Sequence, residues 1–104
     1  MIVEDAGHSL ATILPYLHLA RRSGSLAVGH SAVKRCLASG KCRLVIMAVD
    51  AGGSMKRLDL GSVLTLNLGT REELGGWLDR DEVSILGLTD PNLVTGITKR
   101  MKSS

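Results

Sequence analysis

The sequence predicts a single α/β domain in which a small sheet carries helices on both of its faces. Segments with the apolar spacing of strands alternate along the chain with segments that have the spacing of amphipathic helices. The longest unbroken apolar run is Leu44 to Val49, and an unbroken run is typical of a strand covered on both faces. A chain of 104 residues that is 44% hydrophobic can bury one core without disulfides or a metal.

The first half of the chain is predicted to contain two helices and two strands. Residues 1–11 are expected to form a flexible N-terminal segment, and the domain is expected to span residues 12–102. Thr12–Arg22 has the pattern of a helix, with Ile13, Leu17 and Ala20 facing inward. After it we expect a strand at Leu26–Val28, a helix at Ser31–Ser39 with Gly40 as its left-handed cap, and a strand at Leu44–Ala48.

The second half is predicted to alternate in the same way. Thr70 and Glu73 have the spacing of a reciprocal N-terminal cap, which begins a helix that Gly75 and Gly76 weaken. The expected elements are a connector at Asp50–Gly53, a short helix at Ser54–Leu58, a strand at Val63–Leu68, a helix at Thr70–Leu78, a strand at Val83–Leu88 and a last helix that Asp90-Pro91 opens.

Charge is unevenly distributed along the chain. Arg21 to Arg57 contains eight basic residues and one acid, a balance of +7, whereas Asp59 to Asp90 contains seven acids and two basic residues, a balance of −5. We therefore expect one basic and one acidic region on the folded molecule. A polyanionic partner would meet the basic one.

The helix after Gly29 is the strongest candidate for that contact. Its pattern places Val33 and Cys36 on the packed side, whereas Lys34 and Arg35 lie on the outward side. The first backbone N–H groups of a helix lack internal partners and attract anions. This arrangement predicts a phosphate-bearing partner.

Other chemistries find no support in the residue pattern. Cys36 and Cys42 lack metal-ligand spacing and are interpreted as reduced, packed thiols. Neither a catalytic constellation nor a nucleotide-cofactor motif is visible, so we predict no enzymatic activity, no metal and no cofactor. No membrane span or secretory signal is visible, which predicts a cytoplasmic protein. Tyr16 and Trp77 are the sole aromatic residues, which favours structured RNA over single strands stacked on aromatic platforms.

Several motifs in this order resemble the kink-turn-binding ribosomal proteins. They are Leu19-Ala20-Arg21-Arg22-Ser23-Gly24, Gly29, Gly40 to Ile46, Asp50-Ala51, Gly69 to Gly75 and Leu88-Thr89-Asp90. The chain is most similar to the bacterial YlxQ-like branch of that superfamily, which also contains the archaeal L-seven-Ae type, over about Leu14 to Met101. The resemblance implies a three-layer α/β/α sandwich with a small four-stranded mixed sheet.

The resemblance also implies two RNA-contacting elements. The family's turn into the second helix reads Gly-x-Asn-Glu-x-x-Lys, and here Ser31, Ala32 and Arg35 stand at the Asn, Glu and Lys positions. These changes argue against base-specific recognition of the kink, because Ala32 has no polar group and Arg35 presents a different fork of donors. The second element corresponds to Asp79–Ser84, which is acidic but in which Val83 and Ser84 are expected to touch an extruded base.

We therefore predict a non-enzymatic protein that binds structured, kinked RNA such as ribosomal RNA. The predicted RNA-binding residues are Gly29, His30, Ser31, Lys34, Arg35, Lys41, Val83 and Ser84. One alternative is a protein-interaction or assembly module on the same fold, with a protein partner in a ribonucleoprotein. Another is an accessory substrate-binding domain of an RNA-modifying enzyme.

Overall fold

The computed structural model of the chain describes residues 2–4, 10–53 and 58–102. The four predicted strands and the predicted helices within the described residues are found in the predicted order, with ends that differ by at most two residues. The observed elements are β1 Ile2–Glu4, the 3-10 helix η1 Leu10–Thr12, α1 Leu14–Arg22, β2 Leu26–Val28, α2 His30–Ala38, β3 Leu44–Met47, β4 Leu64–Asn67, α4 Arg71–Gly76, β5 Ile85–Leu88 and α5 Pro91–Lys102. The short helix predicted at Ser54–Leu58 lies, except for Leu58, outside the described residues.

The sheet is mixed, with the strand order β1-β4-β3-β5-β2. β3 pairs in parallel with β4 and antiparallel with β5, and β5 pairs antiparallel with β2. All four residues of β3 and all four of β5 are buried, as a strand covered on both faces requires. The predicted α/β class is confirmed, and the four predicted strands form the sheet together with one further strand.

That further strand, β1, lies within residues 1–11, the segment expected to be flexible, of which the structure describes residues 2–4 and 10–11. Ile2–Glu4 pairs in parallel with Thr65–Asn67 and thereby satisfies backbone groups along the outer edge of β4. Leu10 is also fixed, because its side chain is only 7% exposed in the core. The pairing partner of β1 is more than 60 residues away in the sequence, so no local pattern indicates this pairing.

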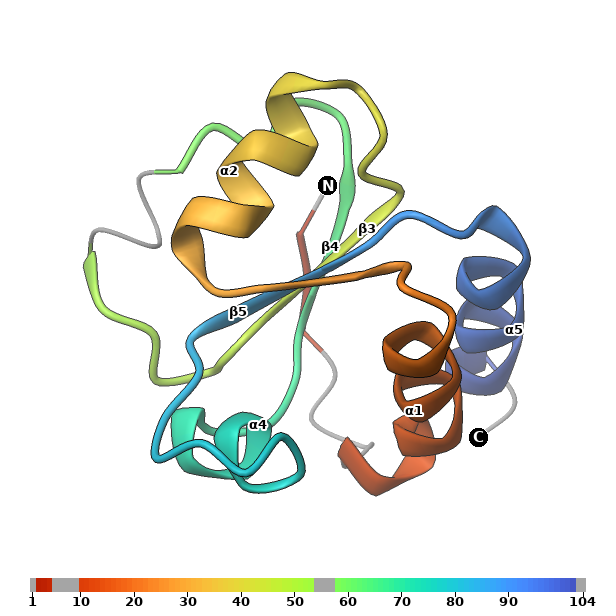
Figure 1. Cartoon of the computed structure of the whole chain (residues 1–104). Helices are drawn as coiled ribbons and strands as arrows, with labels where there is room; N and C mark the ends of the chain where they lie inside the picture. The colour runs from red at the N-terminus through yellow and green to blue at the C-terminus, as the bar shows by residue number, and fades with distance from the viewer. Residues whose placement is uncertain (1, 5–9, 54–57, 103–104) are drawn as a thin grey trace.

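The helices lie in two layers on either side of the sheet. Figure 1 shows α2 on one side of the strands, and α1 and α5 together on the other. The inward residues predicted for the first helix are confirmed, since Ile13, Leu17 and Ala20 are fully buried. Gly96 lets α5 approach α1 closely, because an added Cβ would stand 2.6 Å from the ring of Tyr16. These contacts complete an α/β/α sandwich.

None of the helices in the described part of the chain is long and apolar enough to cross a membrane.

Candidate nucleic-acid interface

Three turns of the chain meet at one end of the sheet, which we call the loop end. The amide of Gly29 donates to the carbonyl of Ile85 at 3.0 Å, so the turn from β2 into α2 lies beside the start of β5. The amide of Ala48 donates to the carbonyl of Ser84 at 2.9 Å, and that of Val49 donates to Gly69 at 2.8 Å. The two RNA-contacting elements implied by the family resemblance are therefore neighbours in space.

The turn at Gly29 leaves the start of α2 without a side-chain cap. Gly29 is the N-cap residue, with φ 90° and ψ 169°, a backbone conformation that strains any residue with a side chain. An added Cβ at Gly29 would meet nothing within 4 Å, so the backbone angle and not crowding requires glycine. The first-turn amides of α2, beginning with His30 and Ser31, accordingly have no side-chain acceptor. They are available to an anion.

Lys34 and Arg35 are both exposed, as predicted for the outward side of α2. Lys34 lines a surface depression of about 290 Å³ together with Asp59, whereas Arg35 lines a depression of about 350 Å³ on the β2 side. The two residues line different depressions because consecutive helical residues are about 100° apart. Each cation therefore serves a different flank of α2.

Lys41 lies beyond the opposite end of α2 from Gly29. It is exposed and lines the same depression as Arg35, beside Thr89 at the far end of β5. A helix of nine residues separates the two ends by roughly 13 Å, at about 1.5 Å per residue. The structure thus does not place Lys41 at the loop end, although it does place it with Arg35.

In the second RNA-contacting element, Asp79–Ser84, the structure does not expose both of the predicted contact residues. Val83 is only 5% exposed and belongs to the core, and its amide donates to the carbonyl of Arg71 at 3.0 Å. Its side chain is therefore not placed to touch a base, which corrects the expectation for Val83. The reason is that Val83 packs into the core two residues before β5 begins at Ile85. Ser84 is half-buried, whereas Asp79 and Asp81 are exposed.

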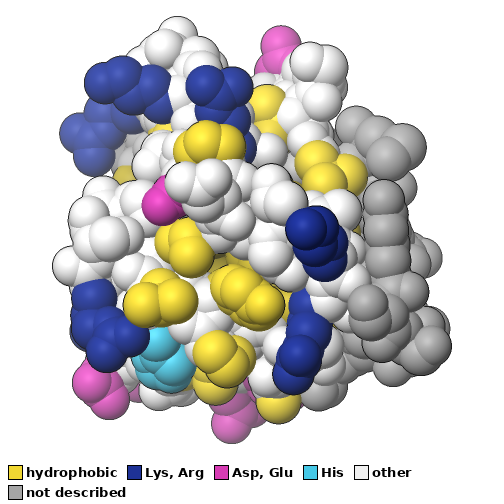
Figure 2. All heavy atoms as spheres, turned by 90° about the vertical axis from the view of Figure 1, so that its right-hand side faces the viewer, with side chains coloured by type: hydrophobic (Ala, Val, Ile, Leu, Met, Phe, Trp, Pro, Cys, Tyr) yellow, Lys and Arg dark blue, Asp and Glu magenta, His cyan; other side chains and the backbone are white. Residues whose placement is uncertain are grey.

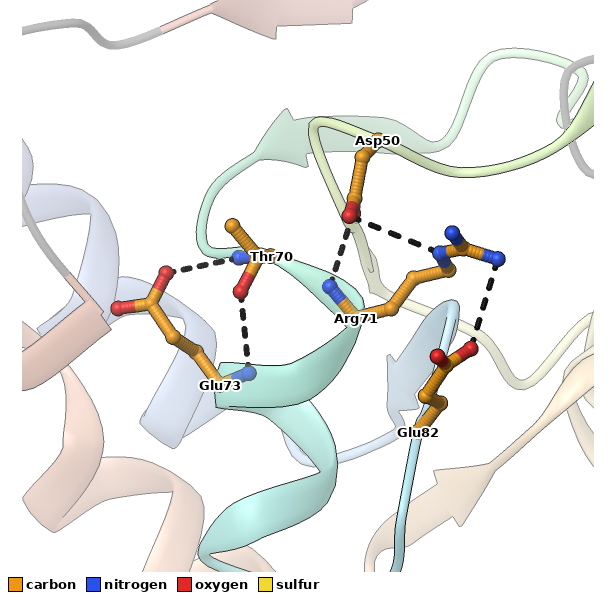
Figure 3. Close-up of polar contacts among 5 residues, drawn as sticks. All are labelled: Asp50, Thr70, Arg71, Glu73 and Glu82. Carbon is orange, nitrogen blue, oxygen red and sulfur yellow. Dashed lines mark hydrogen bonds and ion pairs between the residues drawn. The ribbon is translucent and has the colours of Figure 1, made fainter.

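Sequence reasoning missed an ion-pair cluster that joins the turns of the loop end. Figure 3 shows Arg71, the first residue of α4, between the carboxylates of Asp50 and Glu82. Asp50 Oδ1 accepts the Arg71 amide at 2.8 Å, Arg71 Nε stands 3.6 Å from Asp50 Oδ2, and Arg71 Nη1 stands 3.4 Å from Glu82 Oε2. The three side chains are 41–59% exposed, so solvent screens the pairing. Its role is to hold the acidic loop against the exit of β3.

Local packing fixes the same loop from the side of α4. The predicted reciprocal cap is confirmed, because Thr70 Oγ1 accepts the Glu73 amide at 3.1 Å and Glu73 Oε1 accepts the Thr70 amide at 2.9 Å. Gly75 is buried against the returning chain, where an added Cβ would stand 2.8 Å from the carbonyl oxygen of Arg80. Asp79, at the bend between them, has φ 59°. Asp81 and Glu82 are therefore held in a defined position.

The two cysteines are free thiols, as predicted. Burial raises the pKa of the Cys42 thiol to about 12, and the adjacent Cys36 thiol adds to the rise. Such a thiol stays protonated and is a poor metal ligand or nucleophile. Within residues 2–4, 10–53 and 58–102, no group of three or more His, Cys, Asp or Glu side chains is arranged to hold a metal ion.

The face formed by α1 and α5 has a different character from the loop end. Figure 2 shows apolar side chains gathered on it, with Lys and Arg side chains around them. Leu19 of α1 is 45% exposed, and Leu93 and Val94 of α5 are partly buried. This face therefore offers apolar contact area as well as positive charge.

Comparison with known proteins shows where this fold occurs. No protein-family model matches the sequence, and no curated protein matches it. A Bacillus halodurans protein of unknown function has a similar structure, with 26% sequence identity and a TM-score of 0.74 over 88% of this chain and 97% of that chain. A 15.5-kD RNA-binding protein of Giardia lamblia is similar with 16% identity and a TM-score of 0.67, over 88% of this chain and 83% of that chain. The fold is shared with both.

Proposed function

We propose that this protein binds structured RNA through the loop end and the adjoining sides of α2. The observation that carries the proposal is the uncapped start of α2 at Gly29, which opens beside the start of β5 and is followed by Lys34 and Arg35. Helix starts with unpaired amides are natural phosphate sites. The RNA-binding function of the Giardia lamblia neighbour supports RNA binding and membership of the kink-turn-binding superfamily. The YlxQ-like branch of that superfamily is proposed from the sequence resemblance alone.

The geometry favours recognition of RNA backbone and shape over recognition of bases. Ser31 is exposed and offers one hydroxyl, whereas Ala32 is half-buried and offers no polar group to a base edge. The amides of His30 and Ser31, the helix dipole and the two cations all act on phosphates. We therefore propose a non-enzymatic, cytoplasmic protein with ribosomal RNA as the candidate partner and with little base specificity at the kink.

Binding titrations test this function directly. Kink-turn RNA, plain duplex and single-stranded RNA are titrated with the protein at two salt concentrations. If about three to five phosphates are neutralised, the log-log salt slope is expected to be on the order of −2 to −4, with the kinked RNA bound most tightly. A slope near zero contradicts the phosphate mechanism, and equal weak binding to all three RNAs contradicts shape recognition.

A double variant tests the cations of α2. Replacing Lys34 and Arg35 with alanine is expected to weaken RNA binding and to make the salt slope shallower by about two, one for each lost phosphate contact. Both side chains are exposed, so the fold is expected to persist in circular dichroism. Arg100→Ala, an exposed cation near the end of α5, is the control. Unchanged affinity of the double variant contradicts the assignment.

The apolar face of α1 and α5 favours a second function, that of a protein-assembly module. Leu19 of this face is 45% exposed. Figure 2 shows Lys and Arg side chains around the apolar side chains of the face, a combination that suits a protein partner. A purified partner protein that stays bound after nuclease digestion and is released by Leu19→Glu would support this function. An absence of RNA affinity in the same preparation would replace the first proposal with it.

A further inference from the structure

The depression on the β2 side of α2 has features that phosphate binding at the loop end does not explain. It has a volume of about 350 Å³, within the lower part of the range of about 300–1,000 Å³ that holds small ligands. Its residues come from the start of β2, from α2 and from the chain on either side of Gly40; they are Gly24, Ser25, Leu26, Ala27, Ala32, Arg35, Cys36, Ser39, Lys41 and Thr89. Two of them are cations and none is an acid.

The floor of this depression is apolar, and its free donors are the two cations. Leu26, Ala27 and Cys36 are partly buried and pack against the core. The hydroxyls of Ser39 and Thr89 donate to the carbonyls of Cys36 and Ser25, at 2.9 Å and 3.3 Å. A ligand here would meet apolar groups together with the side chains of Arg35 and Lys41. An anionic group attached to an apolar ring has this pattern.

The wall formed by β2 is also the open edge of the sheet. β2 is the last strand in the sheet order, and in Figure 1 it is the orange segment in front of the other strands, between α1 and α2. The Gly29 amide donates to the Ile85 carbonyl, and the Ser25 carbonyl accepts from the Thr89 amide. Every second residue therefore exchanges hydrogen bonds with the neighbouring strand, and Ala27, opposite Gly87, is one of these. The backbone groups of Leu26 and Val28 therefore point outward, away from β5. They add hydrogen-bonding capacity at this edge.

We infer that this depression holds one unpaired nucleotide of the bound RNA, with its phosphate at Arg35 and Lys41 and its base against Ala27 and Cys36. The inference rests on the RNA binding proposed above and gives the RNA a direction, from the loop end along the β2 side of α2. The other side of α2 is less suitable, because the depression that Lys34 lines also contains the carboxylate of Asp59. A duplex is too wide for a depression of this volume, whereas one extruded nucleotide fits.

The test uses two RNA hairpins that differ by a single unpaired, extruded uridine. The wild-type protein is expected to bind the bulged hairpin about tenfold more tightly than the fully paired one, which corresponds to about 1.4 kcal/mol. Arg35→Ala and Lys41→Ala are each expected to remove most of that preference. Arg100→Ala is the control, because it removes the same charge from an exposed position on α5 and is expected to leave the preference intact.

A second measurement locates the nucleotide independently of affinity. Cys36 lines the depression and is half-buried, whereas Cys42 is buried and serves as an internal reference. Bound bulged RNA is expected to slow alkylation of Cys36 by iodoacetamide, measured by mass spectrometry. The fully paired hairpin, at equal occupancy, is expected to leave the alkylation rate unchanged.

The outcomes separate the two proposals. Equal affinity for the two hairpins, loss of the preference in Arg100→Ala, or equal protection of Cys36 by both RNAs overturns the nucleotide site while RNA binding stands. Binding of neither hairpin overturns RNA binding itself, and the nucleotide site falls with it.

Discussion

At the scale of single residues, the adjacent glycines of α4 have different roles. The sequence indicated that Gly75 and Gly76 both weaken the helix, but the structure gives a packing reason for one of them. An added Cβ at Gly75 would stand 2.8 Å from the carbonyl oxygen of Arg80 and 3.0 Å from the backbone of Glu82. At Gly76 it would meet nothing within 4 Å. Gly75 thus allows the acidic loop to return against the helix.

Alanine substitutions distinguish the two positions. Gly75→Ala is expected to destabilise the protein by about 1–3 kcal/mol, because backbone atoms of the loop must move. Gly76→Ala, the matched control, is expected to be neutral or to stabilise by up to about 1 kcal/mol through lower unfolded-state entropy. Urea unfolding measures both free energies. A Gly75→Ala variant as stable as Gly76→Ala would show that the loop is not held by this contact.

The buried Cys42 thiol makes stability depend on pH in the alkaline range. Its pKa is raised from 9.0 to about 12 in the folded protein, so above pH 9 the unfolded chain loses a proton that the folded chain keeps. Stability from this group is complete below pH 9 and is lost as pH rises toward 12, by about 1.4 kcal/mol per pH unit. Unfolding free energies at pH 7 to 10 are compared with those of Cys42→Ala. A constant difference between the two proteins across this range is the contrary result.

At the scale of elements, the start of α4 was predictable because its signal is local. Thr70 and Glu73 form the reciprocal cap that their spacing indicates. Thr70→Ala is expected to cost about 1 kcal/mol in thermal or urea unfolding, since the Glu73 amide loses its acceptor. Thr95→Ala is the control, because the hydroxyl of this exposed residue inside α5 bonds only to the Pro91 carbonyl among the described contacts. Equal losses for the two variants would mean that the cap contributes nothing.

Other features of the elements depended on contacts that no local pattern encodes. The sequence placed β2 at its observed residues and α2 within one residue at each end, because apolar period and flanking glycines mark them. It missed β1, whose three residues gain their structure from the edge of β4. It placed Lys34 and Arg35 on the exposed side of α2, but it could not indicate the depressions that they line, because these depend on Asp59 and on β2, which are distant in sequence.

At the scale of the whole molecule, folding brings together charges that the sequence keeps apart. The basic segment 21–57 and the acidic segment 59–90 meet at the loop end, where the Gly29 amide bonds to Ile85. Arg71 pairs with Asp50 and Glu82, which leaves Asp79 and Asp81 as exposed carboxylates on the neighbouring loop. An RNA bound at the start of α2 therefore also experiences negative charge from this loop, which limits affinity and restricts the path of the RNA.

Removing one of these carboxylates tests whether the negative charge of the loop lowers the affinity for RNA. Asp81→Asn keeps the size of an exposed side chain and is expected to raise affinity for kink-turn RNA about twofold at low salt, the effect of one charge at roughly 10 Å in water. Thr95→Lys adds the same unit of net charge on exposed α5 and is expected to leave affinity almost unchanged. Titrations at low and high salt are needed, because screening removes the gain when the Debye length becomes shorter than the separation. If both variants gain equally, net charge alone governs the affinity and the position of the acidic loop does not matter.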